Sequence, residues 1–596
     1  MVDFADVDTL AACYHRRGGQ PGLAYGIVIG GELVHAAGLG ERHLGGPPPD
    51  DGTVFRIASM TKSFTASAIL VLRDDGALQL DNLAEAYVPE MRDWPPVSPD
   101  SARISVRHLL TMTAGFPTDD PWGDRQQGLP LEEFATLLAK GVRFTWAPGT
   151  RFEYSNLGYA ILGRVITAVT GMAYTDYIRH RLLHPLGMTR TGYEAEEFEV
   201  PGQQTSGSAG VARGYRRTSS GWAEMGFDPA GAFAPMGGIF SCVRDLTPWV
   251  AGFAAAFPPG DAGAADAHPV RRATRREMQL PQVLTGWAVA PGFPGDGSSS
   301  PPATYGFGLF VDERPTLGRI VSHSGGYPGF GSNMCWHPAT GTGVIALGNS
   351  SYAAMAPLAA RLLEGVVRQG EPAAPGYGVA LAPREPQGTR GPAPWPETLA
   401  ARAAVSRLLA SWDDAEAQRL FSPNVALDAP FPERQRKIAL IRERIGDFGD
   451  DPARRPEFDT PAHCRWWLAG ERGVVQVQIQ LNPERPPRVQ SLTLAVPPAA
   501  DSALSVTLDA VVDWLNGADR DWPPSIPVAD GVDTGMLARR LRMAAVWAGP
   551  GRVGACKAGD GIASVAVELA GKHVAITLAL VIDPATRLLR LADVTL

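Results

Sequence analysis

The sequence predicts an α/β domain with an antiparallel sheet flanked by helices and a helical subdomain, followed by two small α+β repeat units. Strand-like apolar runs occur near both ends of the first part of the chain, with mainly helical patterns between them. A stretch rich in Gly and Pro then interrupts the pattern, and the remaining residues repeat one motif. At roughly 100–200 residues per domain, 596 residues also exceed one domain. The expected divisions are 1–370 for the α/β domain, 371–396 for a linker, and 397–500 and 501–596 for the repeat units.

The first domain is expected to begin with a helix over Val7–Arg17 and a β-hairpin. Two apolar runs, Leu23–Ile29 and Glu32–Ala37, flank the pair Gly30 and Gly31, and glycines of this kind favour a tight turn. The hairpin supplies the first two strands of the sheet.

The same domain is expected to end with further strands and a helix over Met355–Val367. The strands are predicted at Tyr305–Val311, Arg319–His323, Gly331–Trp336 and Gly343–Leu347. A sheet assembled from both ends of a domain, with helices inserted between them, is an α/β arrangement.

A helix is predicted after Phe55, with apolar residues recurring at helical spacing up to a stop at Gly76. Ser59 and Lys62 lie three positions apart, on one face of its first turn. A serine hydroxyl needs an adjacent base to act as a nucleophile, and a lysine with a lowered pKa can be that base. By itself the pair is more typical of a solvated helix surface.

A second candidate element is Tyr154–Asn156, on a loop that enters a helix near Leu157. Tyrosine can relay protons, and the amide of Asn156 can orient both a lysine and a substrate carbonyl. The structural alternative is an asparagine N-cap beside a core tyrosine.

A third element is His323–Gly326, at the end of a predicted strand. A glycine N–H such as that of Gly326 can approach a substrate closely, and Ser324 and Gly325 are candidate substrate-binding residues. The similar triplet His43–Gly45 lies in a loop rich in Gly and Pro, and we interpret it as structural.

The C-terminal part contains an internal repeat with a constant offset of 101 residues. Leu468–Pro483 matches Leu569–Pro584, and each is followed by a strand and preceded by a helix that carries a Trp. The same order of elements in both copies favours a tandem duplication.

Composition limits the partners of this chain. The net charge of −8 argues against nucleic acid as a main partner, and no apolar run is long enough for a membrane span. Five widely spaced cysteines give neither a disulfide framework nor a zinc motif, so no metal or other cofactor is expected. The acidic first residues lack a signal-peptide pattern, which predicts a cytoplasmic protein unless a leader has been removed. The sequence leaves the oligomeric state open.

Taken in order, Ser59 with Lys62, Tyr154 with Asn156, and His323 with Gly325 resemble the motifs of the serine β-lactamase and penicillin-binding protein superfamily. The resemblance covers about residues 10–370 and is strongest to the branch of class C β-lactamases, DD-peptidases, D-aminopeptidases and esterases. It implies a β-lactamase/transpeptidase-like fold.

The resemblance also implies a role for each residue. Ser59 is the nucleophile that becomes acylated, Lys62 and Tyr154 share acid and base work, and Asn156 orients the substrate amide. The backbone N–H groups of Ser59 and Gly326 form the oxyanion hole. His323 replaces the lysine of many relatives, which weakens recognition of a free substrate carboxylate.

Three functions are open at this stage. The first is a serine hydrolase that cleaves amides or esters of small molecules or peptides, with peptides containing D-residues as the favoured class. The second is acyl transfer or peptide cyclisation in a biosynthetic pathway through the same acyl-enzyme. The third is a sensor that is acylated without turnover and uses the repeat units for interactions.

Overall fold

The computed structural model describes most of the chain. The described residues are 4–16, 20–198, 210–218, 221–257, 266–286, 303–314, 317–370, 393–499, 502–517, 521–529, 532, 534, 535, 537, 538, 541, 551–559, 561, 564–571, 575–583 and 586–595. The chain forms two compact units, one containing residues 1–288 and 301–377 and the other containing almost all of the rest.

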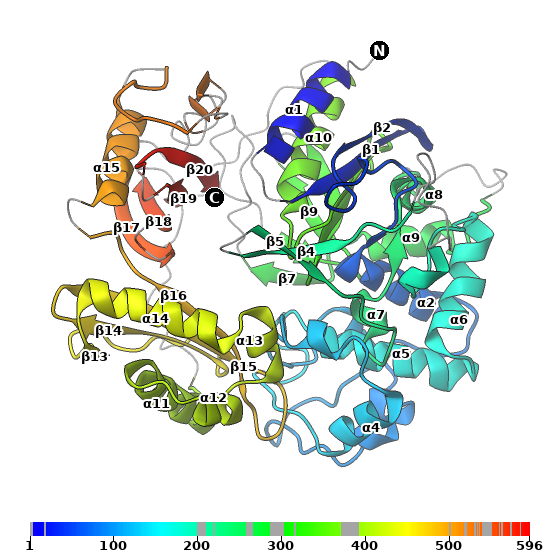
Figure 1. The fold of residues 1–596 in the computed structure, drawn as a ribbon. Helices are drawn as coiled ribbons and strands as arrows, with labels where there is room; N and C mark the ends of the chain where they lie inside the picture. The colour runs from blue at the N-terminus through cyan, green and yellow to red at the C-terminus, as the bar shows by residue number, and fades with distance from the viewer. Residues whose placement is uncertain are drawn as a thin grey trace. The chain divides into compact units, whose positions relative to one another are not determined.

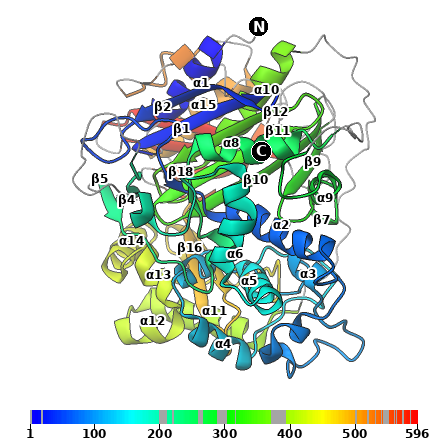
Figure 2. The same cartoon turned by 90° about the vertical axis from the view of Figure 1, so that its right-hand side faces the viewer.

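The first unit is built on one eight-stranded antiparallel sheet in the order β2-β1-β12-β11-β10-β9-β8-β7 (Figures 1 and 2). β1 pairs with β12, so the two ends of the domain form one sheet, as predicted. The strands are β1 (Gly22–Ile29), β2 (Glu32–Gly40), β7 (Val283–Gly286), β8 (Ala303–Tyr305), β9 (Phe310–Arg314), β10 (Gly318–Tyr327), β11 (Phe330–His337) and β12 (Thr342–Gly348).

Two of the strand predictions were wrong in detail. The run Tyr305–Val311 is not one strand, because Gly308 has a φ of +71° and turns the chain between β8 and β9. His323 does not end its strand, because β10 continues to Tyr327 and includes both glycines of the motif. Apolar patterning detects neither a turn inside an apolar run nor a strand that continues through glycines.

Helices cover both faces of this sheet. Helices α1 (Phe4–Arg16) and α10 (Met355–Gly370) pack together on one face, where their apolar side chains meet those of β1 and β12. Helix α8 (Val243–Ala254) packs on the opposite face. The sheet is therefore buried on both sides, which explains why β11 and β12 are buried at every residue.

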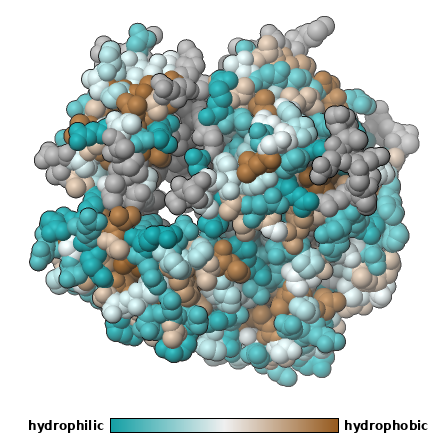
Figure 3. Space-filling view, viewed as in Figure 1, coloured by the Kyte–Doolittle hydropathy of each residue, from teal (hydrophilic) through white to brown (hydrophobic). Residues whose placement is uncertain are grey.

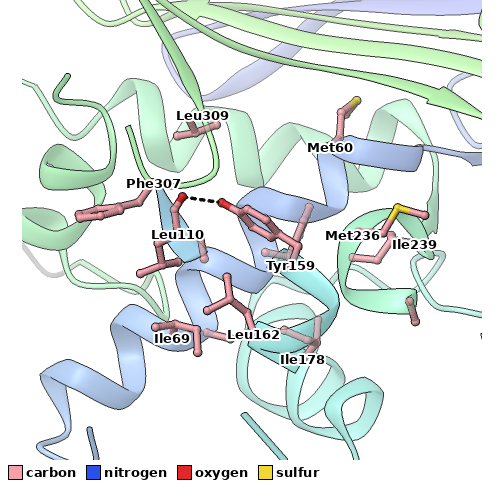
Figure 4. Close-up of a cluster of buried hydrophobic side chains, with 14 of the residues drawn as sticks. Met60, Ile69, Leu110, Tyr159, Leu162, Ile178, Met236, Ile239, Phe307 and Leu309 are labelled. Atoms are coloured by element: carbon pink, nitrogen blue, oxygen red, sulfur yellow. Dashed lines mark hydrogen bonds between the residues drawn. The ribbon is translucent and has the colours of Figure 1, made fainter. Parts of the chain in front are cut away.

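A helical region lies beside the second face and forms the largest hydrophobic core. Figure 4 shows part of it, where Tyr159 donates a hydrogen bond to the carbonyl of Leu110 among apolar side chains. Its helices are α2 (Thr61–Asp74), α3 (Val106–Leu110), α4 (Leu131–Ala139), α5 (Asn156–Thr170), α6 (Tyr174–Ile178), α7 (Ala234–Gly237) and α9 (Arg272–Met278). Two short antiparallel pairs join β3 (Phe55–Arg56) to β6 (Phe240–Ser241), and β4 (Gly214–Thr218) to β5 (Gly221–Met225).

The second unit contains two four-stranded antiparallel sheets, each with its strands in chain order. The first has helices α11 (Pro396–Ala410), α12 (Asp414–Leu420), α13 (Pro423–Asp428) and α14 (Phe431–Ile445) and strands β13 (Phe448–Asp450), β14 (His463–Gly470), β15 (Gly473–Leu481) and β16 (Val489–Ala495). The second has α15 (Ala503–Asn516) and strands β17 (Gly551–Ala558), β18 (Ser564–Gly571), β19 (Ala575–Ile582) and β20 (Leu589–Thr595).

Both sheets show a register shift in the third strand, after Gln480 and after Val581, which are 101 positions apart. The α+β character of the second unit matches the prediction. The register shift that both sheets share supports a tandem duplication, which stays a prediction. Residues 371–392 of the expected linker lie outside the described residues, and Pro396 is the first residue of α11.

The surface is mixed in character. On the face seen in Figure 3, hydrophilic residues predominate and hydrophobic residues form small, separate patches. No single helix of the described segments is long and apolar enough to cross a membrane; one bent pair, 156–170 with 174–186, meets that length and composition only together, across a 79° bend. All five cysteines are within the described ranges, and none of them forms a disulfide there.

Candidate active site

Ser59 lies in a short 3₁₀ turn, Ala58–Met60, that leads directly into α2. The preceding residue, Ala58, has a φ of +48°, a left-handed conformation that residues other than glycine rarely adopt. Strain of this kind persists only where the surroundings impose it, and it is concentrated at functional sites. Ser59 is 8% exposed, so its hydroxyl lies in a confined space.

Lys62 is fully buried and its ammonium group is held by three oxygen atoms. Nζ lies 2.9 Å from Ser59 Oγ, 2.7 Å from Asn156 Oδ1 and 2.8 Å from the carbonyl oxygen of Met236. These contacts join α2, α5 and α7, and they bring together residues 94 positions apart in the sequence. The structure therefore places the predicted base in hydrogen-bond contact with the predicted nucleophile.

The environment of Lys62 favours its neutral form. Burial lowers the pKa of Lys62 to about 8, because the charged form loses its hydration. Asp120, Asp124 and Asp119 oppose this shift, with Asp120 contributing most. A base with a pKa near 8 is partly neutral around neutral pH and can accept a proton from Ser59.

Tyr154 contacts both the nucleophile and the lysine. Its hydroxyl is hydrogen-bonded with Ser59, and the Lys62 Nζ lies 4.9 Å from the centroid of its ring. Burial and the nearby carboxylate of Asp120 raise the pKa of Tyr154 well above its usual value. Tyr154 therefore keeps its proton near neutral pH and is suited to donate or relay it rather than to act as a phenolate.

Asn156 is the first residue of α5, and two aspartates fix its position. Its backbone N–H donates to Asp119 Oδ1 at 2.7 Å, and its side-chain Nδ2 donates to Asp120. With Nδ2 on a carboxylate, Oδ1 of Asn156 faces Lys62. The N-cap of α5 is Ser155, whose hydroxyl accepts from Gly158 N, so the alternative of an asparagine N-cap was wrong.

The sequence analysis missed the aspartates that surround this site. Asp119 and Asp124 are buried, and Asp120 is an exposed residue whose carboxylate still reaches Asn156. Desolvation raises the pKa of the two buried carboxyl groups, that of Asp119 to about 7. The adjacent acidic pair Asp119–Asp120 was the available signal.

His323 lies on β10 and is 1% exposed. Its Nδ1 donates to the carbonyl oxygen of Ser324 at 2.7 Å, so Nε2 is left to accept from the hydroxyl of Tyr305 at 3.3 Å. Burial and the charge of Lys62 lower the pKa of His323 to about 3. This histidine is therefore neutral near neutral pH, whereas an unperturbed histidine would be partly charged.

The three residues after His323 have different environments. Ser324 is exposed, and its hydroxyl accepts a hydrogen bond from Asn333 at 2.9 Å, so it can face a ligand. Gly325 is buried against the turn before the nucleophile, since a Cβ there would lie 2.2 Å from the carbonyl oxygen of Ile57. Gly325 thus holds β10 against that turn, and the next residue, Gly326, is half-buried.

The predicted residues come together in one place. Lys62 contacts Ser59 and Asn156, Tyr154 contacts Ser59, and the rings of Tyr154 and His323 are 6.4 Å apart between centroids. Over the described ranges, no group of His, Cys, Asp or Glu side chains has the arrangement to hold a metal ion. What this arrangement can do is transfer an acyl group to a serine through a lysine base and a tyrosine acid.

Comparisons with known proteins agree with this description. The family model described as "Beta-lactamase" matches residues 7–367. Protein flp of Staphylococcus aureus (strain COL) is 31% identical over 196 residues, which span 32% of this chain and 39% of that protein. Penicillin-binding protein 4* of Bacillus subtilis is 24% identical over 313 residues, 51% of this chain and 63% of that protein.

Among solved structures, the octameric penicillin-binding protein homologue from Pyrococcus abyssi is similar with a TM-score of 0.50 and 19% identity. That similarity covers 100% of this chain and 98% of the other and concerns the fold alone. With a family model matched over more than half of its length, this chain belongs to the β-lactamase family, whose members are serine hydrolases.

Proposed function

We propose that this protein is a serine hydrolase that cleaves amide or ester bonds through an acyl-enzyme on Ser59. The observation that carries the proposal is the triangle of Ser59, Lys62 and Asn156, in which Lys62 Nζ is within 2.9 Å of both side chains. A buried lysine between a serine and an amide has its pKa lowered and its position fixed, as a general base requires.

In the proposed reaction Lys62 accepts the proton of Ser59 as its oxygen attacks the substrate carbonyl. The negative charge that develops on the carbonyl oxygen is stabilised by the N–H groups of Ser59 and Gly326. Tyr154 then donates its proton to the leaving group and recovers a proton from Lys62. Water finally hydrolyses the acyl-enzyme and frees Ser59. An added amine could take the place of water, so acyl transfer would use the same intermediate.

The neutral state of His323 supports a particular class of substrate. A charged lysine at this position would attract a substrate carboxylate, whereas a buried neutral histidine supplies only weak attraction. We therefore propose that the substrates are esters and amides without a carboxylate beside the scissile bond. Among peptides, we propose that those whose acyl group comes from a D-amino acid are favoured.

The test is covalent labelling by a fluorophosphonate, measured by intact mass and peptide mapping. We expect one adduct on Ser59 of the wild type, none in Ser59→Ala, and loss of p-nitrophenyl acetate hydrolysis in the same variant. Ser63→Ala is the control, because Ser63 lies four positions further on, in α2, and its hydroxyl donates to the carbonyl of Met60. Undiminished labelling of Ser59→Ala would exclude Ser59 as the nucleophile.

A further inference from the structure

Tyr352, in the segment that follows β12, combines two unusual properties. Its φ is +53°, so a bulky residue holds a left-handed backbone conformation. It is also 45% exposed, although most tyrosines of this unit are buried or half-buried. Strain that brings no gain in burial has to be imposed by specific contacts, and strained residues are concentrated at ligand-binding sites.

The contacts of Tyr352 reach both sides of the active site. Its ring lies against Gly326, since a Cβ on that glycine would be 2.9 Å from Cδ1 of the ring. Its hydroxyl donates to Asp124 Oδ2 at 2.9 Å. Asp124 follows Gly123, where a Cβ would lie 2.8 Å from that of Asn156. Tyr352 therefore connects β10, which carries Gly326, to residues 123 and 124, which pack on Asn156.

These contacts also restrain the ring. The backbone N–H of Tyr352 donates to the carbonyl oxygens of Phe330 and Tyr327 at 3.0 and 3.2 Å, which fixes the backbone from which the side chain projects. The hydrogen bond to Asp124 fixes the hydroxyl end of the ring, and Asp124 is itself only 1% exposed. Swinging the ring away would break the bond to Asp124 and leave a buried carboxyl group without that partner.

We infer that Tyr352 is a specificity-determining residue whose fixed ring limits the length of the acyl group. The inference rests on the proposed function, in which the N–H of Gly326 binds the carbonyl oxygen of the substrate. An acyl chain attached to that carbonyl starts next to Gly326 and meets the ring that lies against the same glycine. Short acyl groups fit beside the ring, and longer chains require it to move.

The test compares p-nitrophenyl acetate with p-nitrophenyl octanoate, which share a leaving group and differ only in the acyl chain. We expect Tyr352→Ala to raise the octanoate-to-acetate ratio of kcat/KM at least about tenfold, since misfit of a few methylene groups is worth that much or more. Tyr352→Phe, which keeps the ring but not the bond to Asp124, should give a smaller rise. Tyr87→Ala, which removes a tyrosine bonded to Asn82, is the control and should leave the ratio unchanged.

Fluorophosphonate labelling of each variant separates this inference from the proposed function. If Ser59 is labelled and the ratio is unchanged in both Tyr352 variants, the inference fails and the serine hydrolase stands. If Tyr352→Ala does not fold, the Tyr352→Phe ratio alone decides, and no change there overturns the inference. If the wild type neither reacts with the probe nor cleaves the acetate ester, both are overturned.

Discussion

The charge state of Lys62 determines the pH range in which Ser59 can be activated. The pKa of Lys62 is lowered to about 8, so the neutral, basic form predominates above pH 8. Below that pH, the neutral fraction falls about tenfold for each pH unit. We expect kcat/KM for p-nitrophenyl acetate to be level above pH 8 and to fall with a slope near one in logarithmic units at lower pH. Initial rates from pH 5.5 to 9.5 would check this.

The same profile also tests the role of His323. Since burial lowers the pKa of His323 to about 3, this residue should cause no inflection near its usual value of about 6.5. A profile governed by an inflection near 6.5 would contradict control by Lys62, because either an ordinary histidine or Asp119, whose pKa is raised to about 7, would then control the rate.

Replacing Asp120 should change the pKa of Lys62 without removing its contacts. Asp120→Asn keeps an oxygen that can accept from Asn156 but removes the largest charge that supports the protonated lysine. The pKa of Lys62 should then fall, and the acid limb of kcat/KM should move to lower pH. An unchanged midpoint would contradict this electrostatic role.

Asp81→Asn is the matched control for that shift. Asp81 is exposed and paired with Arg107, so its loss should leave the pH profile in place. Activity that is reduced equally at every pH in Asp120→Asn would indicate a purely structural effect of that carboxylate.

At the scale of the element, two glycines should respond oppositely to a methyl group. Gly325→Ala would place Cβ 2.2 Å from the carbonyl oxygen of Ile57 and 2.3 Å from Ser332 Oγ, pushing β10 away from the turn that carries Ser59. We expect a loss of about 1–3 kcal/mol in unfolding free energy, as for other overpacked sites, together with lower activity. Urea unfolding and ester hydrolysis would measure both effects.

Gly365→Ala is the counterpart in α10. Nothing lies within 4 Å of a Cβ there, and the residue is inside a helix. The change should stabilise the protein by about 0.4–1 kcal/mol, because alanine restricts the unfolded chain without strain in the helix. Destabilisation by Gly365→Ala, or tolerance of Gly325→Ala, would show that these two sites are packed differently from this description.

Regular elements were largely predictable because their signal is local. The helix expected at Met355–Val367 is α10, and the hairpin at Leu23–Ala37 is β1 with β2, since the side chains that define each pattern lie within one element. The run at Tyr305–Val311 could not be divided correctly, because the turn depends on the conformation of Gly308 and not on hydrophobicity.

At the scale of the whole molecule, the two units have separate hydrophobic cores. One set of clusters contains only buried residues between 7 and 367, and two further clusters contain only buried residues 395–496 and 504–592. Compact units with cores of their own can unfold separately. A core change in the second unit should therefore leave the chemistry of the first intact.

Ile479→Ala tests this independence. Ile479 is fully buried in β15, and its truncation should cost about 2–5 kcal/mol in that unit. We expect calorimetry to show one transition moving to lower temperature while another stays, with ester hydrolysis unchanged at temperatures below both. A single transition that shifts as a whole would show that the units unfold together.

Most of the regular elements, the order of three short motifs and the residue types that carry the chemistry could be predicted from the sequence. Those signals are local, because helix and strand periods and a Ser–Lys pair three residues apart are set by neighbouring positions. The charge states, in contrast, depend on the tertiary fold. Contacts between distant segments bury Lys62, bring the carboxylates of residues 119–124 close to it, and pair His323 with Tyr305. The electrostatic energy of each group depends on these distances and on the exclusion of water.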